Sequence, residues 1–126
     1  MSLSGADQID PTDAQNGTSG NSSGPSIAVT SVSDNAWFLS ICSAEATFSS
    51  NGTGQTTIAT LTDQSFENAR GTYEGPKTPA GSDTQSFTLS SGQSWAISSV
   101  AVKPSASGVV AVSNGMMTTV TRFWGT

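Results

Sequence analysis

Short runs of β-branched and apolar residues, separated by Gly, Asn, Ser and Pro, recur along the chain from residue 27 onward. No segment of useful length repeats its apolar residues every 3.6 positions, as an amphipathic helix does. Short strands with turn-forming residues between them are typical of an all-β sandwich or barrel. The pattern therefore predicts an all-β fold, an antiparallel β-sandwich, in one domain of 126 residues with almost no helix.

The apolar runs give the expected strands. The run at 37–42 is continuous, so we expect a strand that is buried on both faces or crosses the core. The run at 95–102 carries apolar side chains on both faces, which predicts a central strand that ends before Pro104. Further strands are expected at 27–32, at 57–61, at 87–89, in a short run ending at Phe48, and at 68–74, the last exposed and closed by Gly75-Pro76.

The two ends of the chain are interpreted separately. Residues 5–25 are turn-formers almost throughout, and we expect an irregular loop there. At the C-terminus two apolar runs flank Asn114-Gly115, the strongest hairpin signal in the chain, so a C-terminal hairpin is expected at about 108–124.

Small residues dominate the composition: 23 Ser, 17 Thr and 13 Gly, with only 34% of residues hydrophobic. Small side chains bury little area, and at roughly 25 cal/mol per Å² the expected core is thin. A thin core is often supplemented by oligomerisation, so the large apolar residues near the C-terminus are candidates for a subunit interface. Alternatively, they close the same sandwich. These residues are Met116, Met117, Val120, Phe123 and Trp124.

Charge and residue usage exclude several functions. The net charge of −5 has the wrong sign for a nucleic-acid-binding protein. No run approaches the roughly 18 apolar residues that a membrane helix needs. The chain has no His, so a Ser-His-Asp triad is impossible and the commonest metal ligand is missing. We expect no cofactor, no membrane partner and no enzymatic activity.

The acidic residues offer two further candidate sites. Asp7, Asp10 and Asp13 follow one another at intervals of three and supply oxygens of the kind that bind Ca²⁺, but the spacing matches no EF-hand. We expect them to cap turns instead. None of the glutamates, Glu45, Glu67 and Glu74, lies in an apolar sequence that would raise its pKa, so no acid pair for glycoside hydrolysis is expected.

The single cysteine and the aromatic residues complete the candidates. Cys42 lies in an apolar run, and we expect a small core residue rather than a nucleophile. Trp37 and Trp95 lie within strand runs and are expected in the core. Tyr73 and Trp124, beside polar neighbours, are the candidates for a platform on which a glycan stacks.

Two segments resemble a known type of module. Residues 4–14 fit the pattern S-G-x-D-x-x-x-P-x-D-A, and residues 95–104 fit W-A-x-x-x-V-A-x-K-P. Over roughly residues 3–104 the chain resembles a jelly-roll-like β-sandwich module of bacteriophage structural proteins and bacterial extracellular proteins. No catalytic residues belong to these motifs. In that family several strands precede the first motif, whereas here Met1 stands just before it. We expect those strands to be replaced by residues 108–124, supplied by another subunit, or present on a longer chain.

The resemblance implies a non-enzymatic structural protein of a tailed bacteriophage virion, decorating the capsid or associated with the tail. Its expected partners are other copies of itself and other virion subunits. Residues 1–5 show no secretory signal, and an unpaired cysteine suits folding in a reducing cytosol before assembly. The alternatives are a glycan-binding or adhesive module of a bacterial surface or secreted protein, and a subunit of an extracellular fibre.

Overall fold

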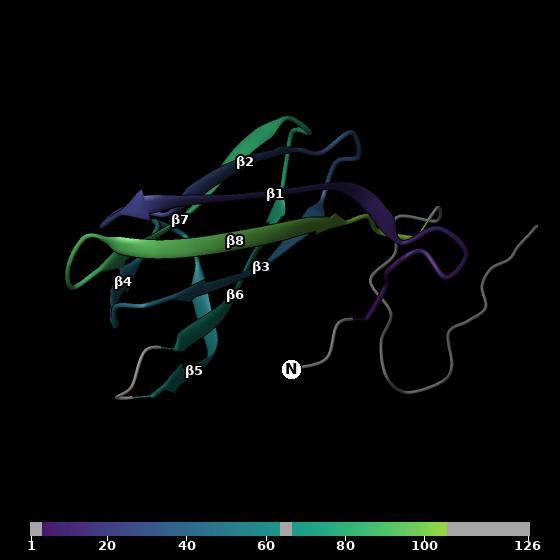
Figure 1. Cartoon of the computed structure of the whole chain (residues 1–126). Helices are drawn as coiled ribbons and strands as arrows, with labels where there is room; N and C mark the ends of the chain where they lie inside the picture. The colour runs from purple at the N-terminus through teal and green to yellow at the C-terminus, as the bar shows by residue number, and fades with distance from the viewer. Residues whose placement is uncertain (1–3, 64–66, 106–126) are drawn as a thin grey trace, which may run out of the picture.

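The structure, a computed structural model, describes residues 4–63 and 67–105 (Figure 1). The regular secondary structure of these described residues consists of eight β-strands, joined by turns and loops. Their bounds are β1 (Thr12–Ser22), β2 (Ser26–Thr30), β3 (Ala36–Ala44), β4 (Phe48–Asn51), β5 (Thr56–Thr62), β6 (Asn68–Lys77), β7 (Ser82–Leu89) and β8 (Gln93–Val102).

The strands form two antiparallel sheets packed face to face. The larger sheet has the order β1-β8-β3-β6-β5, and the smaller has the order β2-β7-β4. Figure 1 shows β1, β8 and β3 running side by side in the larger sheet. The expected all-β antiparallel sandwich is confirmed, with five strands in one layer and three in the other.

Strand β8 is an interior strand of the larger sheet, paired on both sides between β1 and β3 as a central strand is expected to be. It pairs with β3 over eight consecutive positions, from Trp37 opposite Val102 to Ala44 opposite Trp95. Because side chains alternate between the two faces of a strand, this register puts Phe38 and Ala101 on the inner face and Leu39 and Val100 on the outer one.

The core lies between the sheets and is small, as the composition predicts. Phe38 and Phe87 are the largest of the fully buried apolar side chains, and Val29 and Ile27 of β2 pack beside them. Polar side chains share this space. Buried among the apolar groups are Ser40, Gln55, Asn68, Thr72, Glu74, Gln85 and Ser99.

The irregular loop expected at 5–25 is wrong over Thr12–Ser22, which form β1. This strand has no apolar alternation, and almost all of its side chains are exposed. It is a strand because its backbone pairs with β8 at ten positions, which outweighs the preference of Gly, Asn and Ser for turns.

Two expected strands differ from prediction in their burial. Residues 37–42 are not buried on both faces: Phe38, Ser40 and Cys42 are buried, whereas Ile41 is 57% exposed. Residues 68–74 are not an exposed strand, because β6 lies inside the sheet between β3 and β5. That strand also continues through Gly75-Pro76 to Lys77, so this dipeptide does not close it.

The expected C-terminal hairpin and its candidate interface residues lie outside the described residues, as does Trp124. Among the residues that are described, no helix is long and apolar enough to span a membrane.

Candidate functional site

Apolar side chains gather on the outer face of the larger sheet, away from the core. Three of these side chains come from β3, one comes from β6 and two come from β8. The register of strand pairing places all six on the same side of the sheet. We call this set the outer apolar face: Trp37, Leu39, Ile41, Tyr73, Val100 and Val102. Ile41 is exposed and the others are half-buried. An apolar patch on the solvent side of a sheet is informative because single exposed apolar residues are ordinary, whereas contiguous ones mark contact surfaces.

Two aromatic rings stand at one end of this face. The centroids of Trp37 and Tyr73 lie 5.9 Å apart, with the rings tilted by 40°. The indole also lies over Gly75, where an added Cβ would come within 3.2 Å of the ring. Trp37 was expected in the core and instead lies half-buried on the outside, because its neighbour Phe38 takes the inward position of the strand.

The residues registered with the outer apolar face are uncharged. Ile41 stands opposite Gly71 on β6 and Ser98 on β8. Val100 stands opposite Gln15 on β1, and Tyr73 stands opposite Thr56 on β5. In a chain with a net charge of −5, this leaves a neutral surface that a partner can cover without desolvating an ionised group.

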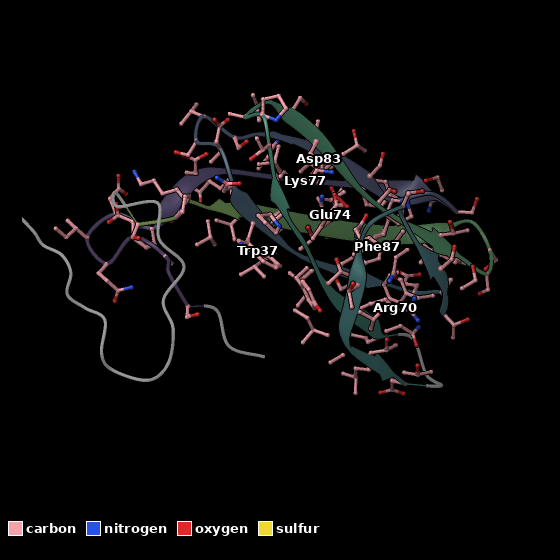
Figure 2. All side chains as sticks on the ribbon, turned by 180° about the vertical axis from the view of Figure 1, so that it is seen from behind. Trp37, Arg70, Glu74, Lys77, Asp83 and Phe87 are labelled. Carbon is pink, nitrogen blue, oxygen red and sulfur yellow. The ribbon has the colours of Figure 1, made fainter. Side chains whose placement is uncertain are left out.

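A charged cluster joins β6 to β7 instead, with Glu74 buried and with Lys77 and Asp83 partly exposed (Figure 2). Lys77 Nζ is 2.9 Å from Glu74 Oε2 and 3.1 Å from Asp83 Oδ1, and Figure 2 shows the three side chains together. Glu74 is only 4% exposed. Its Oε1 is, among the described residues, the buried side-chain polar atom that lacks a hydrogen-bond partner.

Burial raises the pKa of the Glu74 carboxyl above its ordinary 4.5, and the nearby Asp83 carboxylate raises it further, while Lys77 partly offsets both. The expectation that no glutamate lies in a pKa-raising setting is therefore wrong for Glu74. Glu74 is two residues from the buried Thr72 in the same strand, so both side chains point to the inner face.

The polar core continues from this ion pair. Gln85 donates from Nε2 to Asp83 Oδ2 at 2.7 Å and accepts at Oε1 from the Ser40 hydroxyl at 3.1 Å. The Ser40 and Ser99 hydroxyl oxygens are 2.8 Å apart. The chain of hydrogen bonds links the two sheets and satisfies groups whose burial would otherwise be costly.

Asp7, Asp10 and Asp13 have separate protein partners. Asp7 Oδ1 accepts from the backbone N–H groups of Ile9 and Asp10, which is the expected turn cap. Asp10 pairs with Lys103 at 3.0 Å, and Asp13 accepts from the Val32 backbone N–H at 2.7 Å. No cluster of three or more His, Cys, Asp or Glu that could hold a metal ion occurs in the part of the chain that the structure describes.

Cys42 is a core residue, as expected. It is fully buried, and burial raises the pKa of its thiol to about 11. A thiol with so high a pKa stays protonated at neutral pH and is a poor nucleophile.

A hollow of about 220 Å³ opens where β3 and β8 meet the start of β6. Glu45 and Glu67 border it beside Trp95. The Trp95 indole N–H donates to Ser22 Oγ at 3.0 Å, and the ring packs against Ala44 and Leu89 at the margin of the core. Trp95 therefore lies at the edge of the core rather than fully inside it.

Comparison of the chain with protein-family models, with curated proteins and with solved structures finds no match. Of the two predicted platform residues, the structure places Tyr73 on the outer apolar face, and Trp124 lies outside the described part. The aliphatic members of that face were not predicted, because the continuous run at 37–42 marks Leu39 and Ile41 as apolar without telling which side of the strand is covered.

Proposed function

We propose that the chain is a non-enzymatic structural protein of a tailed bacteriophage virion, decorating the capsid or associated with the tail, and that its outer apolar face is the contact surface. The observation that carries the proposal is this neutral apolar face on a sheet whose other side already packs the core. Residues 4–14 and 95–104 resemble modules of bacteriophage structural proteins, and this resemblance supports a phage virion as the particle to which the chain binds. We propose, on the same resemblance, that the sandwich is jelly-roll-like.

The contact energy expected of such a face suits assembly. Fully burying one Ile or Leu side chain contributes about 1.5–3 kcal/mol. A specific interface covers about 800 Å² on each partner, with an apolar centre and a polar rim. The outer apolar face supplies the centre, and the surrounding Ser, Thr and Gln side chains of the neighbouring strands supply the rim. Many identical copies on one particle then add their contacts together.

The direct experiment is mass spectrometry of gradient-purified virions of the phage that encodes the chain. The proposal expects the chain in the particle in a fixed copy number relative to the major capsid or tail protein. Absence of the chain from washed particles that are otherwise complete would contradict the proposal.

A glycan-binding module is the second candidate, because the Trp37 and Tyr73 rings are adjacent on an exposed sheet face. Aromatic faces stack on the apolar faces of sugar rings. This candidate expects binding on a glycan array that disappears in Tyr73→Ala and persists in Thr84→Ala, since Thr84 is exposed on the smaller sheet. No array binding by the parent chain would eliminate it.

A further inference from the structure

We propose that Lys77 and Asp83 join in an intramolecular amide bond, with Glu74 as the group that carries protons between them. The bond runs from Lys77 Nζ to Asp83 Cγ, and its formation releases one water. Lys77 is the last residue of β6 and Asp83 lies in β7, so the amide ties the larger sheet to the smaller one covalently. The chain has one cysteine and therefore no disulfide of its own for this purpose. The inference stands without the assignment to a virion.

The three side chains are already in contact. Lys77 Nζ lies 3.1 Å from Asp83 Oδ1 and 2.9 Å from Glu74 Oε2, and Figure 2 shows them together. The nitrogen thus touches both the carboxyl group that it attacks and the carboxyl group that exchanges protons with it. Groups held in such contact react with effective molarities of up to about 10⁵–10⁸ M. This closeness offsets the preference of dilute aqueous solution for the separate amine and acid.

The loop between β6 and β7 holds this geometry. The Thr78 hydroxyl donates to Asn35 Oδ1 at 2.7 Å. The Ala80 backbone N–H donates to Asp34 Oδ1, also at 2.7 Å. A loop fixed at these two points limits how far the amine and the carboxyl group can separate.

Glu74 is suited to carry protons because it is buried and has a spare oxygen. Its side chain is 5% exposed, and among the described side chains its Oε1 is the buried polar atom without a hydrogen-bond partner. A Cβ added at Gly54 would come within 2.7 Å of this oxygen, so the Gly54 backbone closes over the carboxyl group. Burial and the neighbouring Asp83 raise the pKa of Glu74, which favours the protonated form that a proton carrier must be able to adopt.

Asp83, rather than Glu74, is the carboxyl group that reacts. Gln85 Nε2 donates to Asp83 Oδ2 at 2.7 Å. The Gln85 side chain is fully buried, and its Oε1 accepts from the Ser40 hydroxyl at 3.1 Å, which fixes the donor in place. Such an N–H group stabilises the negative charge that develops on this oxygen when the amine attacks. Glu74 Oε1 has no comparable donor.

The step needs no external reagent. Hydrogen bonds to Glu74 and Asp83 raise the pKa of Lys77, so its proton passes within the cluster, through Glu74 to Asp83 Oδ1, and leaves a neutral amine facing a neutral acid. The Nζ lone pair then forms the new bond to Cγ, and the bond from Cγ to Oδ1 breaks. Two of the three ammonium protons leave with Oδ1 as water, the third stays on the amide nitrogen, and Glu74 regains its starting state. Lys77 is 39% exposed, so the water can leave.

Intact-mass spectrometry of the full chain tests the proposal. After incubation at neutral pH we expect the parent chain to weigh one water less than its sequence. Glu74→Gln should keep the full mass because it lacks the proton carrier. Lys77→Arg should keep it because a guanidinium stays protonated and is no nucleophile. Asp83→Asn is the variant expected to react, with the loss of one ammonia in place of one water, and circular dichroism checks that each variant is folded.

A second ion pair supplies the matched control. Lys103 Nζ lies 3.0 Å from Asp10 Oδ2, a similar distance, but Asp10 is 71% exposed and the pair has no buried carboxyl group beside it. Lys103→Arg should therefore lose one water as the parent does. A parent chain of full mass would overturn the inference. So would a loss of water that persists in Lys77→Arg, which would mark a succinimide elsewhere in the chain.

Peptide mapping locates the bond. Trypsin cleaves after a free lysine, so the bonded chain should resist cleavage after Lys77, and the peptide 71–103 should carry the mass loss and fragment as a loop closed between residues 77 and 83. Complete cleavage after Lys77 in a chain that has lost water would also overturn the inference.

Discussion

The Lys77 ammonium nitrogen lies 2.9 Å from Glu74 Oε2, and the Glu74 side chain is only 5% exposed. The ion pair thus joins a buried carboxylate to an ammonium group that reaches solvent, since the Lys77 side chain is 39% exposed. The buried carboxylate and the apolar outer face of the larger sheet both lead to measurable consequences.

Glu74→Gln tests the buried carboxyl. Because the pKa of folded Glu74 is raised, the stability from this group is complete below its ordinary pKa and is lost as the pH rises through the raised value. The variant has no such loss. We expect the unfolding free energy of Glu74→Gln minus that of the parent to increase from about pH 4 to about pH 8, as measured by urea denaturation. Glu45→Gln, at an exposed glutamate, is the control, and a difference that is flat with pH would refute the account.

Asp13→Asn tests a carboxylate with the opposite shift. Partial burial tends to raise the pKa of Asp13, but hydrogen bonds from the Ser33 hydroxyl and from the Ser33 and Val32 backbone N–H groups, with the charge of Lys103, hold it below 3.8. Its stability is therefore present above the ordinary pKa and lost as the pH falls through the lowered value. We expect Asp13→Asn to cost about 1–2 kcal/mol near neutral pH.

The same comparison in acid provides the check on Asp13. The cost of Asp13→Asn should shrink as the pH falls below 3.8 and through the lowered pKa of Asp13, because the parent carboxyl then becomes protonated as well. An equal cost near neutral pH and in acid would show that the loss comes from packing rather than from the charge.

Phe38→Ala tests the thin core. Phe38 is fully buried against Val29 and Ala101, neighbours with little volume to fill the space it leaves. Such a truncation costs about 3–5 kcal/mol, a large share of the stability of a small domain. Leu61→Ala, at a side chain 66% exposed, should change stability by no more than about 0.5 kcal/mol. Thermal and urea denaturation measure both, and equal effects would contradict the burial pattern.

Ser40→Ala tests the polar core. Removing the hydroxyl leaves Gln85 Oε1 and the Ser99 hydroxyl without a shared partner in a buried position. We expect a cost of about 1–3 kcal/mol. Ser98→Ala, at an exposed residue of β8 that points to the outer side, is the matched control and should be near neutral. A neutral Ser40→Ala would mean that the network contributes nothing to stability.

Apolar runs were enough to predict the central strands, whereas burial depended on neighbours that the sequence does not show. Strand β8 was found from its own residues because both of its faces carry apolar groups. The Gly, Asn and Ser residues of Thr12–Ser22 predict a loop, and only the pairing with β8 makes this segment the strand β1. Polar alternation in β6 hid the burial of Glu74, whose side chain points to the inner face of the larger sheet, towards the smaller sheet.

The candidate site was predictable only in part, for the same reason. Tyr73 was singled out because it stands alone among polar residues. The continuous run at 37–42 predicts a strand buried on both faces or crossing the core, with Trp37 in the core, because such a run does not tell which face is covered. The second sheet covers the Phe38 side of β3, and the opposite side remains outside the sandwich. Which face of β3 is covered is decided by the packing of the two sheets, and the apolar run at 37–42 does not show it.

The most direct test of the proposed contact surface measures binding to the phage particles that are proposed to carry the chain, assembled without it. Binding is compared between the parent, Ile41→Lys and Thr84→Lys. Ile41 is 57% exposed, so the first substitution leaves the core intact and places a charge in the outer apolar face. The account predicts that Ile41→Lys binds at least about tenfold more weakly, which corresponds to about 1.4 kcal/mol, while Thr84→Lys binds like the parent. Equal binding of all three chains, or no binding by the parent, would contradict it.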